Sequence, residues 1–323
     1  RRRGRGGAGA CRARPDRTRA PGARVRPYHF SMLAHLRTLR LAAWLGWQLE
    51  TNWASPWLFA LYMLVKPVCG SLMLVGMFFA ASAATGGVGR RVPVEFLPYM
   101  YVSNACYGLV GTVMFGLSYA VVRDREHYRM LKYIYISPAQ FQTYFLGRGA
   151  SRALEGTIGG VLNLTVGLTL FAQVRTAVAV DVPWLLVYLA IGAAMLWACG
   201  MILAAACLNL SRNGMFLSEG VAGLVYLLSG VVFPLSVFRG NMAWVQWVST
   251  SLPTTYWLEG MRRALMGDVP EKLRGPLSDW SKGELALMLF GTTAALVVLA
   301  QLFWRWSERR AWRLGRLEEN AGV

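Results

Sequence analysis

The sequence has few of the residues with which soluble enzymes do their chemistry. Of its 323 residues only 15% are charged, 16 are Asp or Glu, and three are His. It contains no HExxH metal-binding motif, no GxSxG nucleophile elbow and no GxxxxGKS/T phosphate-binding loop. The sequence therefore predicts no catalytic residue, and if the protein uses ATP, another chain must bind it.

Cysteine and histidine are too scattered to form a metal or redox site. The histidines do not cluster, and we interpret them as solvated surface residues: His29, His35 and His127. The five cysteines show no close pair at metal-ligand or redox spacing. We interpret them as small side chains, four of them within apolar runs: Cys11, Cys69, Cys106, Cys199 and Cys207. We expect neither a cofactor nor a metal in this chain.

Apolar residues, in contrast, are abundant. They make up 55% of the sequence, 13 residues are Trp, and the mean hydropathy is +0.38, which is too high for an ordinary soluble domain. The net charge of +18 suggests nucleic acid, but half of it comes from ten basic residues and one acid, Asp16, within residues 1–31. The remainder has no basic stripe interleaved with aromatic residues. The composition thus predicts a polytopic membrane protein that does not bind nucleic acid.

The chain divides into four regions. Residues 1–31 are rich in Arg, Gly, Ala and Pro, so we expect a disordered basic head. Since Met32 opens an amphipathic segment, we interpret this head as upstream sequence that is not native; the alternative is an arginine-rich anchor for anionic lipid. An amphipathic interfacial helix at 32–55, a six-span domain at 56–318 and a tail at 319–323 follow.

Six segments are long and apolar enough to cross the hydrocarbon layer, which takes about 20 helical residues. The spans are predicted at 57–84, 97–122, 150–172, 183–208, 216–238 and 284–306. Two short helices, rich in Trp and Tyr, are expected to enter the outer interface before the last span. Ser281 and Glu284 form a capping box that opens that span. The expected fold is all-α.

Lys and Arg predict the orientation. The connection at 123–149 and the tail at 305–323 hold five each, whereas the connections at 85–96 and 173–182 hold two and one. By the positive-inside rule, both termini lie in the cytoplasm and the chain is a multi-pass protein of the inner or plasma membrane. The long last outer connection, with six basic residues, is the exception.

Ionisable residues within spans are rare and therefore informative. Lys66 lies in the first span, Arg152 and Glu155 near the inner end of the third, and Glu219 near the inner end of the fifth. Either Arg152 pairs with Glu155 and Lys66 reaches the interface or a partner, or these residues act directly in substrate passage. The glycines of the third span favour close helix packing: Gly156, Gly159, Gly160 and Gly167.

Three motifs resemble those of the type-2 ABC transporter permeases, the membrane domains of exporters for drugs, lipids and polysaccharides. The stretch VVRDREHYRMLKYIYISPAQFQTYFLGR is similar to the family's loop between spans two and three. YLLSGVVFPLSVF is similar to its S-G-x-x-F-P signature, and WVQWVSTSLPTTYWLEGMRRAL to its L-P-x-T-Y and E-G-x-R segment. Where many members carry Gly-Thr-Leu-Glu before the S-P, this chain has HYRMLKYIYI.

The resemblance implies a permease that forms a homodimer, or a heterodimer with a related permease, within membrane lipid. A separate ABC ATP-binding subunit would bind ATP and Mg²⁺ and would attach to the 123–149 loop. There Ser137 is expected to cap a helix with Pro138 at its first position. The ATPase-coupling residues would be Glu126, Leu131, Tyr133, Ile134, Tyr135, Ser137, Pro138, Phe141, Tyr144 and Phe145. The transport path or gate would use Glu155, Glu219, Ser229, Gly230, Phe233, Pro234 and Glu259.

Alternatives remain open at this level. The aromatic residues of the loop would also suit an anchor at the inner bilayer surface. The chain as a whole could be a secondary transporter or a membrane scaffold without an ATPase, although a secondary transporter should show inverted repeats and mid-membrane charges more clearly. The cargo is not determined by the sequence.

Overall fold

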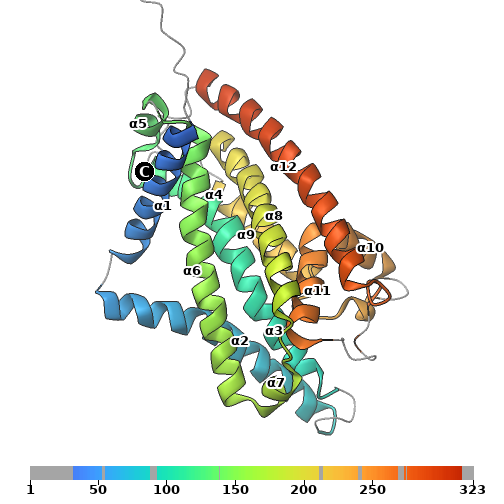
Figure 1. The fold of residues 1–323 in the computed structure, drawn as a ribbon. Helices are drawn as coiled ribbons and strands as arrows, with labels where there is room; N and C mark the ends of the chain where they lie inside the picture. Colours follow the sequence, from blue (N-terminus) through green and yellow to red (C-terminus); the bar gives the residue numbers. More distant parts are fainter. Residues whose placement is uncertain are drawn as a thin grey trace, which may run out of the picture.

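The computed structural model of the protein is a bundle of α-helices, most of which run along one common direction (Figure 1). None of the residues that it describes forms a strand, so the predicted all-α class is confirmed. The head at 1–31 that was expected to be disordered, the tail at 319–323 and Pro138 lie outside the described residues. The described ranges are 32–52, 55–87, 93–137, 139–210, 214–238, 242–267, 273 and 275–314.

Within the described part of the chain, five helical segments are long and apolar enough to cross a membrane. The second is continuous but changes its winding, from α3 through the π-helix η1 to α4. All five overlap predicted spans, although the third begins nine residues earlier than expected, at Phe141. The segments are α2 (Pro56–Ala84), α3 (Phe96–Val110) with η1 (Gly111–Phe115) and α4 (Gly116–Glu126), α6 (Phe141–Leu170), α8 (Val182–Asn209) and α12 (Lys282–Arg313).

The predicted span at 216–238 is not one continuous helix. Helix α9 (Gly214–Leu228) has 15 residues, about 22 Å at 1.5 Å per residue, which is short for a hydrocarbon layer of about 30 Å. It ends in a turn where Gly230 has φ +71°, a left-handed conformation that favours glycine. The short 3-10 helix η2 (Leu235–Val237) follows Pro234. The single-helix expectation for this span is therefore wrong.

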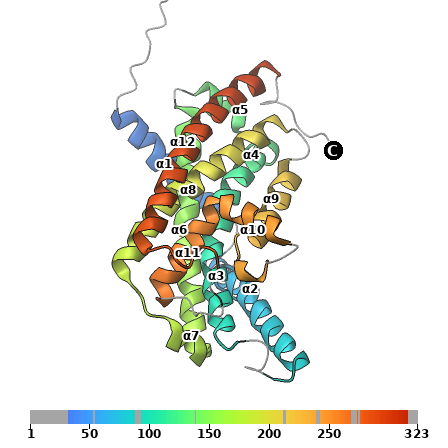
Figure 2. The same cartoon turned by 90° about the vertical axis from the view of Figure 1, so that its right-hand side faces the viewer.

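Helix α1 (Met32–Thr51) packs along α6 (Figures 1 and 2). The approach is close, because a Cβ on Gly147 of α6 would lie 2.6 Å from the Cβ of Ala42, and one on Gly46 would meet Ser151. Four large apolar side chains of α1 are exposed: Leu33, Leu36, Leu41 and Trp44. This leaves an apolar surface on α1, and its position in the membrane interface stays a prediction.

The two short helices expected before the last span are present and differ in burial. In α10 (Ala243–Ser251), Trp244 and Trp247 are exposed, as an interfacial helix requires. Helix α11 (Pro253–Met266) is instead buried, and the indole of Trp257 donates to the carbonyl of Tyr188 at 3.0 Å. The aromatic side of α11 packs on α8, and the expectation that both short helices enter the interface stays a prediction.

The described connections place two sets of segments at opposite ends of the bundle. Helix α5 (Leu131–Ile136) lies with the last turns of α12 at one end, and α7 (Ala172–Ala177) lies at the other (Figures 1 and 2). At the α7 end, Lys282 donates to Asp181 at 2.7 Å, and this hydrogen bond lowers the pKa of the Asp181 carboxyl. The predicted capping box is confirmed: Ser281 Oγ accepts from Glu284 N at 3.2 Å, and Ser281 N donates to the Glu284 carboxylate at 2.6 Å.

Candidate functional site

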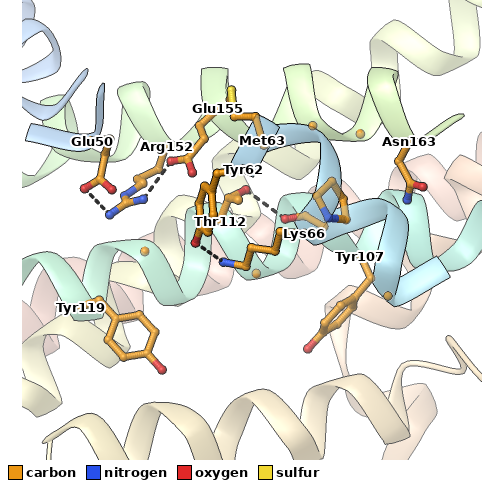
Figure 3. Close-up of a pocket in the computed structure, with 18 of the residues that line it drawn as sticks. Glu50, Tyr62, Met63, Lys66, Tyr107, Thr112, Tyr119, Arg152, Glu155 and Asn163 are labelled. Atoms are coloured by element: carbon orange, nitrogen blue, oxygen red, sulfur yellow. Dashed lines mark hydrogen bonds and ion pairs between the residues drawn. The ribbon is translucent and has the colours of Figure 1, made fainter. Parts of the chain in front are cut away.

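A cavity of about 600 Å³ lies between α2, the α3–α4 segment and α6, and it is open because Tyr62 and Lys66 on its wall are exposed. This volume falls within the range of small-molecule sites, roughly 300–1,000 Å³. Figure 3 shows charged groups at one end, Lys66 in the middle and Asn163 at the other end. Its apolar wall includes Met63, Pro67, Ala105, Val122 and Met215.

Glycines explain why the bundle is hollow here. A Cβ added to Gly108 or Gly111 would meet nothing within 4 Å, and one on Gly159 would reach only Pro67, at 4.0 Å. A Cβ on Gly156 would instead lie 2.0 Å from Thr112 Oγ1. The expected role in close packing therefore fits Gly156, whereas Gly159 leaves open space.

The π-helix η1 shapes the cavity wall. Its residues Gly111 and Thr112 both line the cavity, and the Thr112 hydroxyl donates to the carbonyl of Gly108 at 2.9 Å. A π-helical turn carries an extra residue compared with an α-helical one and is frequent at functional sites. Sequence reasoning did not identify this wall, since nothing in GLVGTVMFG marks a change of helix type.

One end of the cavity is closed by four charged groups from three helices, of which Figure 3 shows Glu50, Arg152 and Glu155. Glu50 of α1 binds both Arg123 of α4 and Arg152 of α6. Arg152 also donates to Glu155 at 2.8 Å, which confirms the predicted pairing of these two residues. The two arginines and two carboxylates balance each other, so this end of the cavity carries no net charge.

The opposite end is closed by neutral hydrogen bonds. Ser71 of α2 accepts from Asn104 at 2.9 Å and from Asn163 at 2.8 Å. The Tyr101 hydroxyl donates to the Asn163 side chain at 3.0 Å, and that of Tyr226 to Asn104 at 3.2 Å. These bonds join α2, α3, α6 and α9, and they satisfy the amide groups that border the cavity.

Most predicted path residues lie elsewhere. Glu155 lines the cavity, but Glu219 is exposed on α9 and is not part of the wall. The others gather where the turn after α9 meets α11: Ser229, Gly230, Phe233, Pro234 and Glu259. The sequence analysis placed all these residues in one transport path, whereas in the structure Glu155 lies apart from the residues around the turn after α9. A gating role for the second set stays a prediction.

That second set surrounds a buried arginine. Arg262 is 1% exposed, donates to the carbonyl of Gly230 at 3.1 Å and lies 4.5 Å above the ring of Tyr99. Glu259 pairs with it at 3.5 Å, and Ser229 hydrogen-bonds Thr254 at 2.7 Å. The arrangement fixes the turn after α9 against α3 and α11.

The predicted coupling residues divide by exposure. Tyr133 is 68% exposed on α5 and Glu126 is exposed beside it, whereas Ile134 and Tyr135 are half-buried. Leu131, Phe141, Tyr144 and Phe145 are buried in the chain's own core. Ile136, which the sequence did not single out, is 69% exposed.

The buried rings pack against α12. The centroids of Phe141 and Phe145 lie 5.7 and 5.5 Å from that of Trp304. These rings therefore do not form an accessible docking face, because α12 covers them. Sequence reasoning could not foresee this, since Trp304 is more than 150 residues away in the chain.

Ser137 does not cap the helix that follows it. Its hydroxyl donates to the carbonyl of Ile134 at 2.7 Å, so it ends α5, and α6 begins after Gln140. The hydroxyl also accepts from the backbone N–H of Ala139 at 3.3 Å, but the next helix begins only at Phe141, so the expected cap of that helix is wrong. The connection is held instead by Tyr144, which donates to buried Asp124 at 2.8 Å, and by Arg148, which pairs with the same carboxylate at 3.3 Å.

A comparison with protein families agrees with this architecture. Residues 40–266, from α1 to the end of α11, match the family described as ABC-2 type transporter. The chain belongs to the ABC-2 type transporter family. It is thus a multi-pass membrane subunit of an ABC transporter and is not itself catalytic. No curated protein matches the chain.

Several residues of this ABC-2 subunit escaped sequence reasoning. Glu50 lies in an amphipathic helix and Asp124 at the end of a span, where carboxylates are usually solvated, yet both hold arginines. Arg262, three residues after Glu259 on its helix, is buried as well. A signal existed for Asp124, because an acid flanked by arginines at the end of an apolar run marks a candidate buried pair.

Proposed function

We propose that this subunit forms the membrane path of an ATP-driven exporter in the inner or plasma membrane. Two copies, or one copy and a related permease, would join with ATP-binding subunits that carry the ATP and Mg²⁺. The ATPase would contact the end of the bundle that holds α5. Family membership establishes a transporter subunit. The proposal adds the direction of transport, the ATP-binding partner and the way in which ATP hydrolysis is coupled to transport.

The observation that carries the proposal is the construction of α5. Tyr133 and Ile136, three residues apart, are both about two-thirds exposed on a helix of six residues. Residues three apart share a face of a helix. Exposed aromatic and aliphatic side chains on a helix that packs against the protein core are typical of the residues that contribute most to binding a partner protein.

The base of α5 transmits force because it is fixed to two spans. Asp124 at the end of α4 binds Tyr144 and Arg148 of α6, and Leu131 is 1% exposed. A push on α5 therefore reaches α4 and α6, both of which line the cavity. The predicted coupling role of Phe141, Tyr144 and Phe145 is retained in this proposal as support for α5.

The test is a double substitution, Tyr133→Ala with Ile136→Ala. The tagged chain is expressed with its ATP-binding subunit, and binding is measured after purification in detergent, together with ATP-dependent transport in vesicles. Because truncation of a central anchor commonly costs more than 1 kcal/mol, we expect binding to weaken about tenfold or more. Val180→Ala, an exposed apolar change near α7, is the matched control and should leave binding intact.

Two results would contradict the proposal. Unchanged ATPase binding and unchanged transport in the double variant would favour a role for α5 as a membrane anchor. Transport that persists without ATP, or an absence of any ATP-binding chain in the purified complex, would favour the secondary transporter or scaffold. In either case the family assignment would stand.

A further inference from the structure

Lys66 differs from the other charged residues of the cavity wall. Glu50, Arg123, Arg152 and Glu155 form one neutral network at the cavity's end. Lys66 is outside this network, and no described carboxylate lies within 4.0 Å of its ammonium. Lys66 instead contacts Tyr62, one turn earlier in α2: the Tyr62 hydroxyl accepts from Nζ at 3.2 Å, and the centroid of its ring lies 5.5 Å from Nζ. The cavity therefore contains one uncompensated positive charge.

Lys66 also offers hydrogen-bond donors to the cavity. An ammonium has three donors, and Tyr62 accepts from one of them. The amides of Asn104 and Asn163 each donate one N–H to Ser71, and the Thr112 hydroxyl donates to its own helix. Among the described wall residues outside the Glu50 network, the Lys66 ammonium is the donor that carries a positive charge.

The position of Lys66 argues against a merely solvated side chain. It lies ten residues into α2, about 15 Å from the helix start at 1.5 Å per residue. In Figure 3 its amine lies between the charged network and Asn163. A charge within a membrane span is costly unless an opposite charge or water compensates it.

The remaining wall suits an apolar chain. Met63, Pro67 and Met215 present aliphatic or thioether surface, and the glycines of α3 and η1 leave room beside them. One cation against an otherwise neutral, largely apolar wall is complementary to a molecule with one anionic group and one apolar tail.

We propose that the cavity binds single-chain anionic amphiphiles, with the carboxylate, phosphate or sulfate group on Lys66 and the tail along α3 and α6. This inference rests on the proposed function, because it names the substrate class of that exporter. The four-residue network of Glu50, Arg123, Arg152 and Glu155 limits the cavity at the headgroup side without adding net charge.

The experiment uses palmitic acid with a diazirine in its chain, its methyl ester and the corresponding amine. The purified full chain in phosphatidylcholine vesicles is illuminated with each probe, and labelled peptides are mapped by mass spectrometry. We expect the acid to label the Met63 and Tyr107 peptides about tenfold more than the ester, as a charge-assisted hydrogen bond requires. Unlabelled palmitate should compete.

Substitutions of Lys66 test whether its positive charge causes the preference for the acid over the ester. Lys66→Gln should abolish the preference for the acid, Lys66→Arg should keep it, and Lys66→Glu should transfer it to the amine. Arg175→Gln removes an exposed cation outside the cavity and should change nothing. If Lys66→Gln does not fold, the comparison of acid and ester labelling in the unchanged chain and in Lys66→Arg still tests the site.

The site is refuted if acid and ester label equally, or if the preference survives in Lys66→Gln. Competition by phosphatidylglycerol but not by palmitate would identify a bound membrane lipid and would overturn the single-chain assignment. Labelling needs no ATPase, so specific labelling without ATP-driven movement of the acid would contradict the proposed exporter and leave the binding site intact.

Discussion

At the scale of single residues, Gly230 determines how the chain leaves α9. Its φ of +71° is a conformation in which a Cβ is unfavourable, although the space around it is ordinary, with Phe233 O at 3.4 Å from an added Cβ. In that conformation its carbonyl accepts from the Tyr99 hydroxyl at 3.2 Å and from Arg262 at 3.1 Å. The glycine of the S-G-x-x-F-P motif thus allows the left-handed turn in which its carbonyl accepts these two hydrogen bonds.

We expect Gly230→Ala to destabilise the fold by about 1–2 kcal/mol, through left-handed strain rather than through a steric clash. Thermal unfolding in detergent measures this. The control is Gly223→Ala on α9, where an added Cβ meets nothing within 4 Å; alanine should be neutral or stabilise the helix there. Equal melting temperatures for both variants would show that the turn does not depend on glycine.

Single residues were the level at which the sequence was least informative. The pairing of Arg152 with Glu155 could be predicted, because residues three apart on a helix are neighbours. The binding of Glu50 to the same arginine could not, because it joins positions 102 residues apart. Likewise, Arg262 reads as a solvated residue until Tyr99 and Gly230 are placed beside it.

At the scale of elements, the first turns of α6 are part of the packed core. Phe145 is 0% exposed and contacts Phe141, Tyr144 and Trp304, with ring centroids 5.1–5.5 Å apart. These rings fasten the start of α6 to α12. The aromatic face that predicted a docking surface therefore belongs to the core, and the exposed residues of α5 are left for a partner.

We expect Phe145→Ala to destabilise the protein by about 3–5 kcal/mol, the usual cost of removing a buried aromatic ring. Tyr133→Ala, twelve positions earlier and exposed, should leave stability within about 0.5 kcal/mol. Thermal unfolding of both purified variants makes the comparison. A small loss for Phe145→Ala would mean that α6 and α12 are not joined through these rings.

Long spans were predictable because hydrocarbon demands about 20 apolar residues, a pattern that composition shows directly. The first and last residues of each helix were less predictable. Helix α6 begins at Phe141 because its first turn is buried against Trp304, a contact between segments far apart in sequence. Helix α9 ends at Leu228 because Gly230 turns the chain, although Val231, Val232 and Phe233 continue the apolar run.

At the scale of the whole molecule, the basic residues gather at one end of the bundle. The end with α5 holds the last turns of α4 and α12 and the first turns of α6. Among the described residues, the end with α7 and the start of α12 has fewer cations, and Lys282 there is paired with Asp181. The basic residues at the α5 end include Arg123, Arg125, Arg129, Lys132, Arg148, Arg305, Arg309, Arg310 and Arg313.

This asymmetry predicts a cytoplasmic α5 end, since positive residues flanking spans are retained on the inner side. The test places one cysteine at each end in a chain whose native cysteines are replaced by alanine: Gln140→Cys beside α5, and Asp279→Cys before α12, both exposed. A membrane-impermeant maleimide should label Asp279→Cys in right-side-out vesicles and Gln140→Cys only in inverted vesicles. The proposed ATPase contact requires that α5 lie on the cytoplasmic side. The opposite labelling pattern would therefore contradict the coupling proposal. It would leave the Lys66 site open to its own test, because that site lies between the two ends.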